Sequence, residues 1–282
     1  MTGCAAWLAE PVAATAPTAV TWLCLEQPGP WGRKALLESR LDPALGAELI
    51  RRSEGTGVRV LLVRAPGRTE PNRPRRVFLA RTVPGATSLH TTTLADPREL
   101  LDLDFTDPHL GEPTAEPLLL ICTNGRRDRC CTQLGRPIAE ELDQGFRPSI
   151  WECSHLGGHR FAPTGLLLPT GYSYGRLDLA IAQAALLGAR KGVVETVGLR
   201  GRSTWSRRGQ AAELAVRELL AELDPDALSV FEEQDEPVRV EHLDGRRWLV
   251  EVAERALPAA PASCGEEPAP RSAFAAIGLR PV

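Results

Sequence analysis

The chain has 282 residues, 43% of them hydrophobic, which is enough to form a sizeable packed core. Its formal net charge is −3 and no apolar run reaches the length of a bilayer-spanning helix, so we expect neither nucleic acid nor a membrane as a partner. The first residues lack the basic stretch that opens a secretory signal, which favours a cytoplasmic location.

Strand-like and helix-like patterns alternate along most of the chain, as is typical of an α/β fold. Short apolar runs bounded by turn residues predict strands at 21–27, 58–66, 75–83, 116–122, 149–153 and 164–169. Leucines spaced along one helical face predict helices at 41–52, 95–105, 131–145 and 176–192.

Two segments have similar strand–turn–strand patterns, RRVFLARTVPGATSLHTTTL at 75–94 and HRFAPTGLLLPTGYSYGRL at 159–177. They indicate either a degenerate duplication of one βαββα unit or a chance match. We therefore expect an N-terminal half over 19–112 and a second half over 113–200, arranged as a tandem of two units or as lobes of one larger sheet.

The two ends of the chain have different compositions. Residues 1–18 are rich in Ala, Pro and Thr and are predicted to form a loose leader. Residues 201–255 predict a small α+β element, in which a helix is followed by a hairpin that turns at Asp244-Gly245. The Pro- and Ala-rich tail at 256–282 is predicted to be poorly ordered, apart from a docking role for Ser263-Cys264-Gly265.

Four of the seven cysteines lie between residues 122 and 153, and in a reducing compartment such clustering favours metal or redox chemistry. Cys122 ends a predicted strand, and Cys131 begins a predicted helix, where the helix dipole favours a thiolate. His155 and His159 flank two glycines, whose backbone freedom lets both imidazoles face one point. Two thiolates and two imidazoles form a four-ligand set.

This ligand set suits either of two metal centres. Zinc binds two cysteines and two histidines, and the histidine spacing is that of a zinc finger, but the cysteines are further apart than in a short zinc knuckle. A [2Fe–2S] cluster is broader than one ion and tolerates the wider loop, and Cys₂His₂ ligation occurs in Rieske centres. The residues alone favour iron–sulfur only modestly.

The strings CTNGRRDRCC, ECSHLGGHRFA and LLLPTGYSYGRL resemble the sucrase/ferredoxin-like family. The first resembles the family's C-x₈-C element and the second its H-x-G-G-H element; the resemblance is strong over about 115–205. It implies a thioredoxin-like fold and a [2Fe–2S] cluster held by Cys122, Cys131, His155 and His159. The sequence offers no convincing pair of catalytic carboxylates to support a sucrase activity.

Neighbouring residues have expected roles around this set. Cys130 and Cys153 are alternative ligands, because Cys130 adjoins Cys131 and Cys153 lies two residues before His155. Five more residues are expected to surround the ligands: Arg127, Asp128, Gly157, Gly158 and Arg160. The arginines are expected to form a basic rim around the centre, or Arg127 is expected to pair with Asp128 and fix the cysteine loop.

The sequence predicts a redox carrier rather than an enzyme with its own substrate, moving electrons between a donor and an acceptor protein that the residues do not identify. Histidine ligation makes transfer of a proton with the electron an option. One alternative is a thiol oxidoreductase that uses Cys130-Cys131 or Cys122 as a reactive thiol. Others are a zinc-stabilised binding module and a cluster that senses redox state or is delivered to other proteins.

Overall fold

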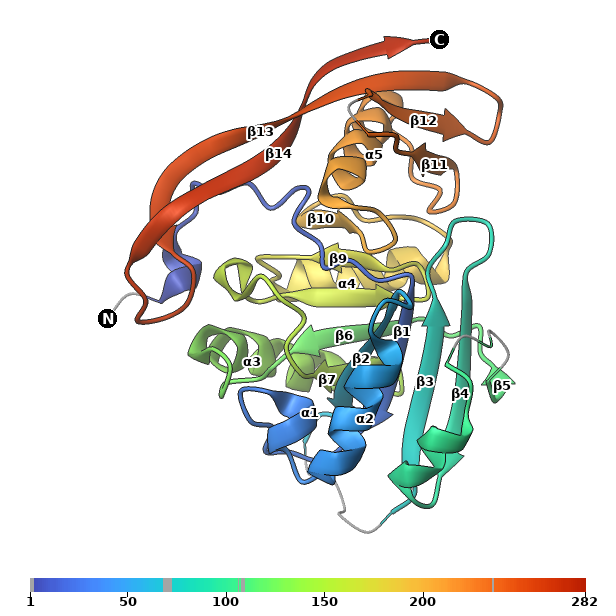
Figure 1. Cartoon of the computed structure of the whole chain (residues 1–282), viewed down its shortest axis with the longest axis vertical. Helices are drawn as coiled ribbons and strands as arrows, with labels where there is room; N and C mark the ends of the chain where they lie inside the picture. Colours follow the sequence, from blue (N-terminus) through green and yellow to red (C-terminus); the bar gives the residue numbers. More distant parts are fainter. Residues whose placement is uncertain (1–2, 68–72, 106, 108–109, 235) are drawn as a thin grey trace.

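The computed structural model describes residues 3–67, 73–105, 107, 110–234 and 236–282. Figure 1 shows a large sheet in the body of the molecule and a smaller sheet at the C-terminal end. The large sheet has ten strands in the order β10-β9-β8-β6-β7-β2-β1-β3-β4-β5, and the small one has the order β11-β12-β13-β14. With helices packed against mixed sheets, the protein has the α/β class that the sequence predicts.

The first half of the large sheet consists of a βαβ unit followed by a hairpin. Strand β1 pairs in parallel with β2 and antiparallel with β3, which in turn pairs antiparallel with β4. Helices α1 and α2 connect β1 to β2. The elements are β1 (Thr21–Glu26), α1 (Ala35–Glu38), α2 (Pro43–Ser53), β2 (Val58–Arg64), β3 (Arg75–Arg81), β4 (Ser88–Leu94), the 3-10 helix η2 (Pro97–Asp102) and β5 (Glu112–Pro113).

The second half repeats this plan. Strand β6 pairs in parallel with β7 and antiparallel with β8, which pairs antiparallel with β9. Helix α3 connects β6 to β7. The elements are β6 (Leu118–Cys122), α3 (Arg129–Phe146), β7 (Ile150–Cys153), the 3-10 helix η3 (His159–Phe161), β8 (Gly165–Leu168), β9 (Tyr172–Tyr174), α4 (Leu179–Arg190) and β10 (Leu199–Arg202).

The two halves therefore have equivalent strand orders, β2-β1-β3-β4 and β7-β6-β8-β9. This is the arrangement that a duplicated βαββα unit would produce, and the two segments that resemble each other in sequence include the hairpins β3–β4 and β8–β9. The halves join through an antiparallel pairing of β2 with β7, in which Val63 lies opposite Cys153. They are thus lobes of one continuous sheet.

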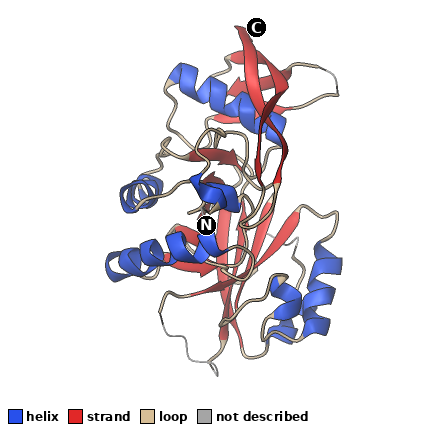
Figure 2. Ribbon diagram, turned by 90° about the vertical axis from the view of Figure 1, so that its left-hand side faces the viewer, coloured by secondary structure: helices blue, strands red, loops and turns tan. Residues whose placement is uncertain are grey.

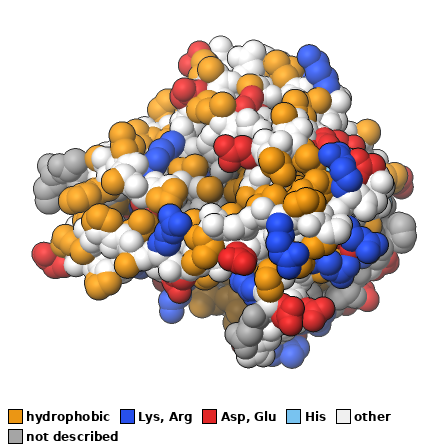
Figure 3. All heavy atoms as spheres, turned by 90° about the horizontal axis from the view of Figure 1, so that it is seen from above, with side chains coloured by type: hydrophobic (Ala, Val, Ile, Leu, Met, Phe, Trp, Pro, Cys, Tyr) orange, Lys and Arg blue, Asp and Glu red, His pale blue; other side chains and the backbone are white. Residues whose placement is uncertain are grey.

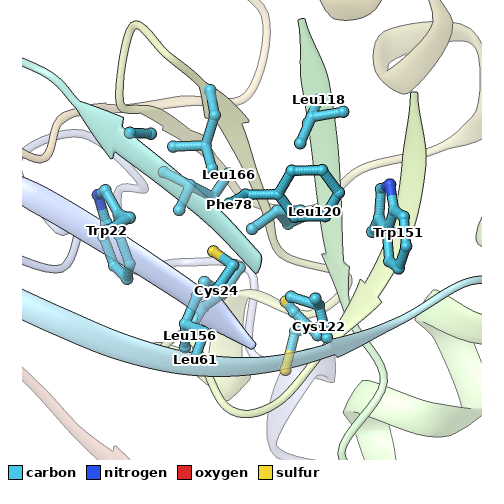
Figure 4. Close-up of a cluster of buried hydrophobic side chains, with 14 of the residues drawn as sticks. Trp22, Cys24, Leu61, Phe78, Leu118, Leu120, Cys122, Trp151, Leu156 and Leu166 are labelled. Atoms are coloured by element: carbon cyan, nitrogen blue, oxygen red, sulfur yellow. The ribbon is translucent and has the colours of Figure 1, made fainter. Parts of the chain in front are cut away.

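One apolar core lies between the inner faces of the two halves. Phe78 on β3 and Trp151 on β7 have ring centroids 4.9 Å apart, although two strands separate β3 from β7 in the sheet. Neighbouring strands are about 4.8 Å apart, so the sheet must curl strongly for these rings to touch. Figure 4 shows the result, with Trp22, Phe78, Leu120 and Trp151 converging from both halves.

The outer faces are covered by helices, which Figure 2 shows on both sides of the strands. Helix α2 begins at the Asp42 cap and Pro43, and its Leu45 and Leu49 pack on the outer face of the first half. Helices α3 and α4 cover the second half, where Leu142 and Leu186 are buried against Leu119 and Ile121. The amphipathic spacing predicted for these helices is thus used to close the core.

The C-terminal sheet corrects the prediction of a poorly ordered tail, because residues 256–282 lie largely in two long paired strands. Helix α5 (Arg207–Leu220) packs on this sheet, whose strands are β11 (Leu228–Phe231), β12 (Val238–His242), β13 (Arg247–Pro261) and β14 (Pro268–Pro281). Proline is tolerated because the ladder is irregular between Leu257 and Ala260, which includes Pro258. Figure 1 shows the turn of this hairpin reaching the N-terminal segment.

The N-terminal segment also differs from the predicted loose leader. It begins with the 3-10 helix η1 (Cys4–Ala6), and Cys4 and Ala16 are buried. The Glu10 carboxylate accepts hydrogen bonds from Arg160 at 2.8 Å and from Arg271 at 2.6 Å. These ion pairs hold the segment between the second half of the sheet and the C-terminal hairpin.

Charges of both signs are interspersed on the face seen in Figure 3. In the described part of the chain, no helix is long and apolar enough to cross a membrane.

If the inner core holds the two halves together, Phe78→Ala should lower the free energy of unfolding by about 3–5 kcal/mol, because it removes a buried ring and leaves a cavity. The half-exposed Phe231, 42% accessible, is the matched control, and its replacement by Ala should cost about 1 kcal/mol or less. Chemical denaturation measures both. Equal losses would show that the inner core contributes no more than the surface.

Candidate metal centre

The candidate centre lies where β6 and β7 end. These strands are parallel neighbours, so the loops that follow them leave the sheet at the same edge. Cys122 is the last residue of β6 and lies opposite Cys153, the last residue of β7. The cysteine loop that follows β6 and the histidine loop that follows β7 are therefore adjacent.

Helix α3 brings the second cysteine to Cys122. Asp128 caps the helix, its carboxylate accepting the Cys130 backbone N–H at 2.9 Å, and this puts Cys131 in the first helical turn. The helix lies very close to the end of β6: a Cβ at Gly135 would be 2.5 Å from the Cys122 carbonyl oxygen. Glycine at position 135 thus permits the approach that brings the two thiols together.

The histidine loop turns back through a glycine pair, as predicted. Gly157 and Gly158 have φ values of 95° and 73°, in the left-handed region that favours glycine. Two arginines, the half-buried Arg59 and the buried Arg200, hold this loop by hydrogen bonds to its backbone. Arg59 donates to the Leu156 carbonyl at 3.1 Å, and Arg200 donates to the Gly157 carbonyl at 3.2 Å.

The four predicted ligands meet in this region as a sulfur pair and an imidazole pair. The Cys131 thiol donates a hydrogen bond to the Cys122 sulfur. This hydrogen bond and the nearby His155 hold the pKa of Cys122 well below its usual value, although burial alone would raise it. The Cys122 sulfur is 4.0 Å from His155 Nδ1, and His155 Nε2 is 3.3 Å from His159 Nδ1. Cys122, Cys131 and His155 have ligand atoms that all lie within 4.8 Å of one another.

His159 is the more enclosed of the two histidines. Burial, and then the neighbouring His155, lower its pKa, so the ring is neutral at pH 7 and able to bind a metal. Its Nε2 lies 2.7 Å from the Ser263 hydroxyl and 3.8 Å from Asp128. Ser263 comes from the turn of the β13–β14 hairpin, so the predicted docking role of this turn has a structural counterpart.

The two alternative ligands lie differently. Cys153 is fully buried in the inner core, and its thiol is protonated because burial raises its pKa. Cys130 points away from Cys131: its sulfur is 3.2 Å from Cys264 and 4.0 Å from Cys4. Consecutive residues of one helix therefore belong to two separate sulfur clusters.

The residues expected around the ligands have partly different partners. Asp128 accepts backbone N–H groups from Cys130 and Cys264, and these hold its pKa below the usual value although burial alone would raise it. Among the residues that the structure describes, no ion pair joins Arg127 to Asp128. Arg160 pairs with Glu10, so it fixes the N-terminal segment rather than forming a free basic rim.

Several residues at the centre have no local signal in the sequence. Arg59 lies on an ordinary strand, and Arg200 lies in β10, a strand that the apolar pattern does not predict. Nothing in the local sequence marks Arg200, which the structure buries almost completely and which donates a hydrogen bond to the Thr15 backbone carbonyl. Ser263 carries only the weak signal of a Ser-Cys-Gly turn.

A protein-family model described as sucrase/ferredoxin-like matches residues 12–199, about two thirds of the chain. The chain belongs to this family. The match covers both halves of the large sheet and the Cys–His centre, whereas Cys4, α5 and the C-terminal sheet lie outside it. No curated protein and no solved structure matches the chain.

Gly158→Ala should disrupt the centre specifically. An added Cβ would collide with the Arg200 guanidinium and would also force alanine into the left-handed region. Gly192 has a similar φ of 68° but open space around it, so Gly192→Ala pays only the backbone cost of about 1 kcal/mol. We expect Gly158→Ala to lose bound metal and Gly192→Ala to retain it, as measured by metal analysis; equal metal contents would contradict this role of Gly158.

Proposed function

We propose that the protein carries a [2Fe–2S] cluster bound by Cys122, Cys131, His155 and His159 and works as an electron carrier. The observation that carries the proposal is the meeting of all four side chains: the ligand atoms of Cys122, Cys131 and His155 lie within 4.8 Å of one another, and 3.3 Å separates the facing nitrogens of His155 and His159. Two nitrogens bound at about 2.0–2.1 Å to one tetrahedral metal lie about 3.3 Å apart. The imidazole pair thus fits one iron, and the hydrogen-bonded sulfur pair fits the other.

The spread of the donors favours a two-metal centre over one zinc ion. A single tetrahedral ion needs its four ligand atoms within about 4 Å of one another. The set within 4.8 Å has three members, Cys122, Cys131 and His155, and His159 stands outside it. The family match, through the ferredoxin part of its name, supports the same choice.

When bound, a [2Fe–2S] cluster supplies one-electron chemistry, at a higher potential with two histidine ligands than with four cysteines. His159 and its two polar neighbours would hold a proton near such a cluster. With Nδ1 of His159 directed at His155, its Nε2 is free to exchange a proton with Ser263 or Asp128. If a cluster bound here were reduced, the lower positive charge beside His159 would raise the affinity of this nitrogen for a proton, so proton uptake would accompany electron uptake.

Buried positive charge also stabilises the added electron. Arg59 and Arg200 lie in the field of Cys122, and burial lowers the pKa of Arg200 to about 9, which still leaves it charged at pH 7. In a low-dielectric interior these guanidiniums favour the reduced state of a nearby centre. The same two guanidiniums donate hydrogen bonds to the histidine loop, so they would both position a histidine ligand and stabilise the reduced centre.

A basic groove of about 360 Å³ adjoins the cysteine loop and is the surface we propose for an acidic redox partner. Asn124 and Gly125 of the loop line it together with arginines from α3 and β2. Arg64 and Arg136 in the groove are balanced by Glu152, whereas Arg126 is exposed at its rim. Complementary charge at such a site mainly raises the association rate, so electron exchange would weaken with added salt.

The cluster itself is tested by iron and acid-labile sulfide in anaerobically purified protein. We expect about two irons and two sulfides per chain, a visible absorption spectrum, and loss of both in Cys122→Ala, because that change removes an anionic ligand. Cys24→Ala, which removes another fully buried thiol, is the control and should retain them. A colourless protein that holds zinc and no sulfide would refute the proposal and favour a zinc-stabilised module.

Histidine ligation is tested by the midpoint potential as a function of pH. The wild-type potential should fall by about 59 mV per pH unit where one proton accompanies one electron. His155→Cys and His159→Cys each add negative charge and should lower the potential by on the order of 100 mV, and His159→Cys, which removes the titrating nitrogen, should also flatten its pH dependence. His242→Cys, in β12, is the control; unchanged potentials in the first two variants would rule out histidine ligands.

A further inference from the structure

A second group of metal-binding side chains lies beside the first, at the junction of the N-terminal segment, helix α3 and the C-terminal hairpin. Its members are three cysteines and one carboxylate whose ligand atoms all lie within 4.8 Å of one another: Cys4, Asp128, Cys130 and Cys264. Three of them are buried and Cys264 is half-buried. They come from three segments that are far apart in the sequence, so local chain geometry does not explain their meeting.

The distances fit one tetrahedral ion. Two thiolates bound to zinc at about 2.3 Å lie about 3.8 Å apart, and a thiolate and a carboxylate oxygen about 3.5 Å apart. The sulfur of Cys4 is 4.0 Å from that of Cys130 and 3.6 Å from that of Cys264, and the Cys130 and Cys264 sulfurs are 3.2 Å apart. Oxygens of Asp128 lie 3.6 Å from the Cys4 sulfur and 3.2 Å from the Cys264 sulfur. In an iron–sulfur cluster the protein ligands are divided between irons, so at least one of three sulfurs would stand further from the others than these distances allow.

Backbone N–H groups are directed at two of the sulfurs, although burial raises the pKa of Cys4 and Cys130 while no ion is bound. The Cys4 backbone N–H points at the Cys264 sulfur at 3.3 Å, and the Ala5 backbone N–H donates to Cys130. Such outer hydrogen bonds orient ligands and stabilise negative sulfur. Gly3 packs against the same sulfurs, since a Cβ there would be 2.6 Å from the Cys130 sulfur. The Asp128 oxygens accept one backbone N–H each and retain lone pairs for a metal.

We propose that Cys4, Asp128, Cys130 and Cys264 form a structural zinc site that joins both ends of the chain to helix α3. Three soft thiolates and one harder oxygen suit Zn²⁺. The site does not depend on the proposed iron–sulfur centre and is distinct from it in ligands. Because the family match begins at residue 12 and ends at residue 199, Cys4 and Cys264 lie outside it.

A zinc ion at this place would also fix the covering of the first centre. Ser263, adjacent to Cys264, is hydrogen-bonded to His159, and Asp128 caps the helix that bears Cys131. Joining the hairpin turn to Asp128 therefore keeps the turn over His159. Without the ion, the hairpin end would be held by the hydrogen bonds of Cys264 to Asp128 and of Ser263 to His159, together with the ion pairs of Glu10.

The test is the metal content of the full chain, purified anaerobically after expression with both iron and zinc supplied. We expect one zinc per chain in addition to iron. Cys264→Ala should lose the zinc and keep the iron and the visible spectrum, whereas Cys122→Ala should lose the iron and keep the zinc. Cys24→Ala is the control for loss of a buried thiol and should keep both metals.

Cobalt binding gives a second measurement that does not require a stable variant. Wild-type chain with zinc removed and Co²⁺ added should develop the intense thiolate-to-cobalt absorption of a tetrahedral sulfur-rich site. Absence of zinc and of this absorption, a disulfide between Cys130 and Cys264 in the unreduced protein, or zinc retained in Cys264→Ala would each overturn the zinc site. Zinc without iron would instead contradict only the electron-carrier proposal.

Discussion

The parallel pairing of β6 with β7 is the constraint on which the metal centre depends. It makes two loops leave one edge of the sheet, and its register sets Cys122 opposite Cys153. Each of the two loops must then bring its second ligand back toward this edge. Helix α3 has to start close enough to return Cys131 to Cys122, which Gly135 permits, and the histidine loop has to turn back within a few residues, which Gly157 and Gly158 permit.

Sequence reasoning identified the parts of the centre that have local signatures. Cys122 ends an apolar strand, Cys131 begins a predicted helix, and a glycine pair lies between the histidines, so each could be placed from its neighbours. Arg200 could not be placed, and for Ser263 and Cys264 the sequence indicated a docking role but not its partner, because their contacts join residues far apart in the chain. No pattern within a single strand or turn specifies which distant segment it will meet.

The C-terminal tail shows a different reason for failure. Its Pro and Ala content indicated disorder because such a segment cannot form a core by itself. The hairpin β13–β14 does not need one along its whole length. One end packs on α5 through Trp248 and Val250, and the other end meets Cys4 and Asp128. Anchoring at both ends orders a stretch that composition alone would leave free, since only the ends need to bury surface.

The centre is asymmetric, and this asymmetry bears on how it would exchange electrons. Its sulfur side is enclosed by the inner core, the buried cluster to which Cys122, Leu61 and Leu156 belong (Figure 4). Its histidine side is covered by the hairpin turn over His159 but left partly open at His155. Burial of the thiolates protects the bonds that hold a metal, whereas an accessible imidazole offers a short path to a partner. With a cluster bound as proposed, its retention would depend mainly on the buried cysteines of β6 and α3, and electron exchange would depend mainly on the accessible His155.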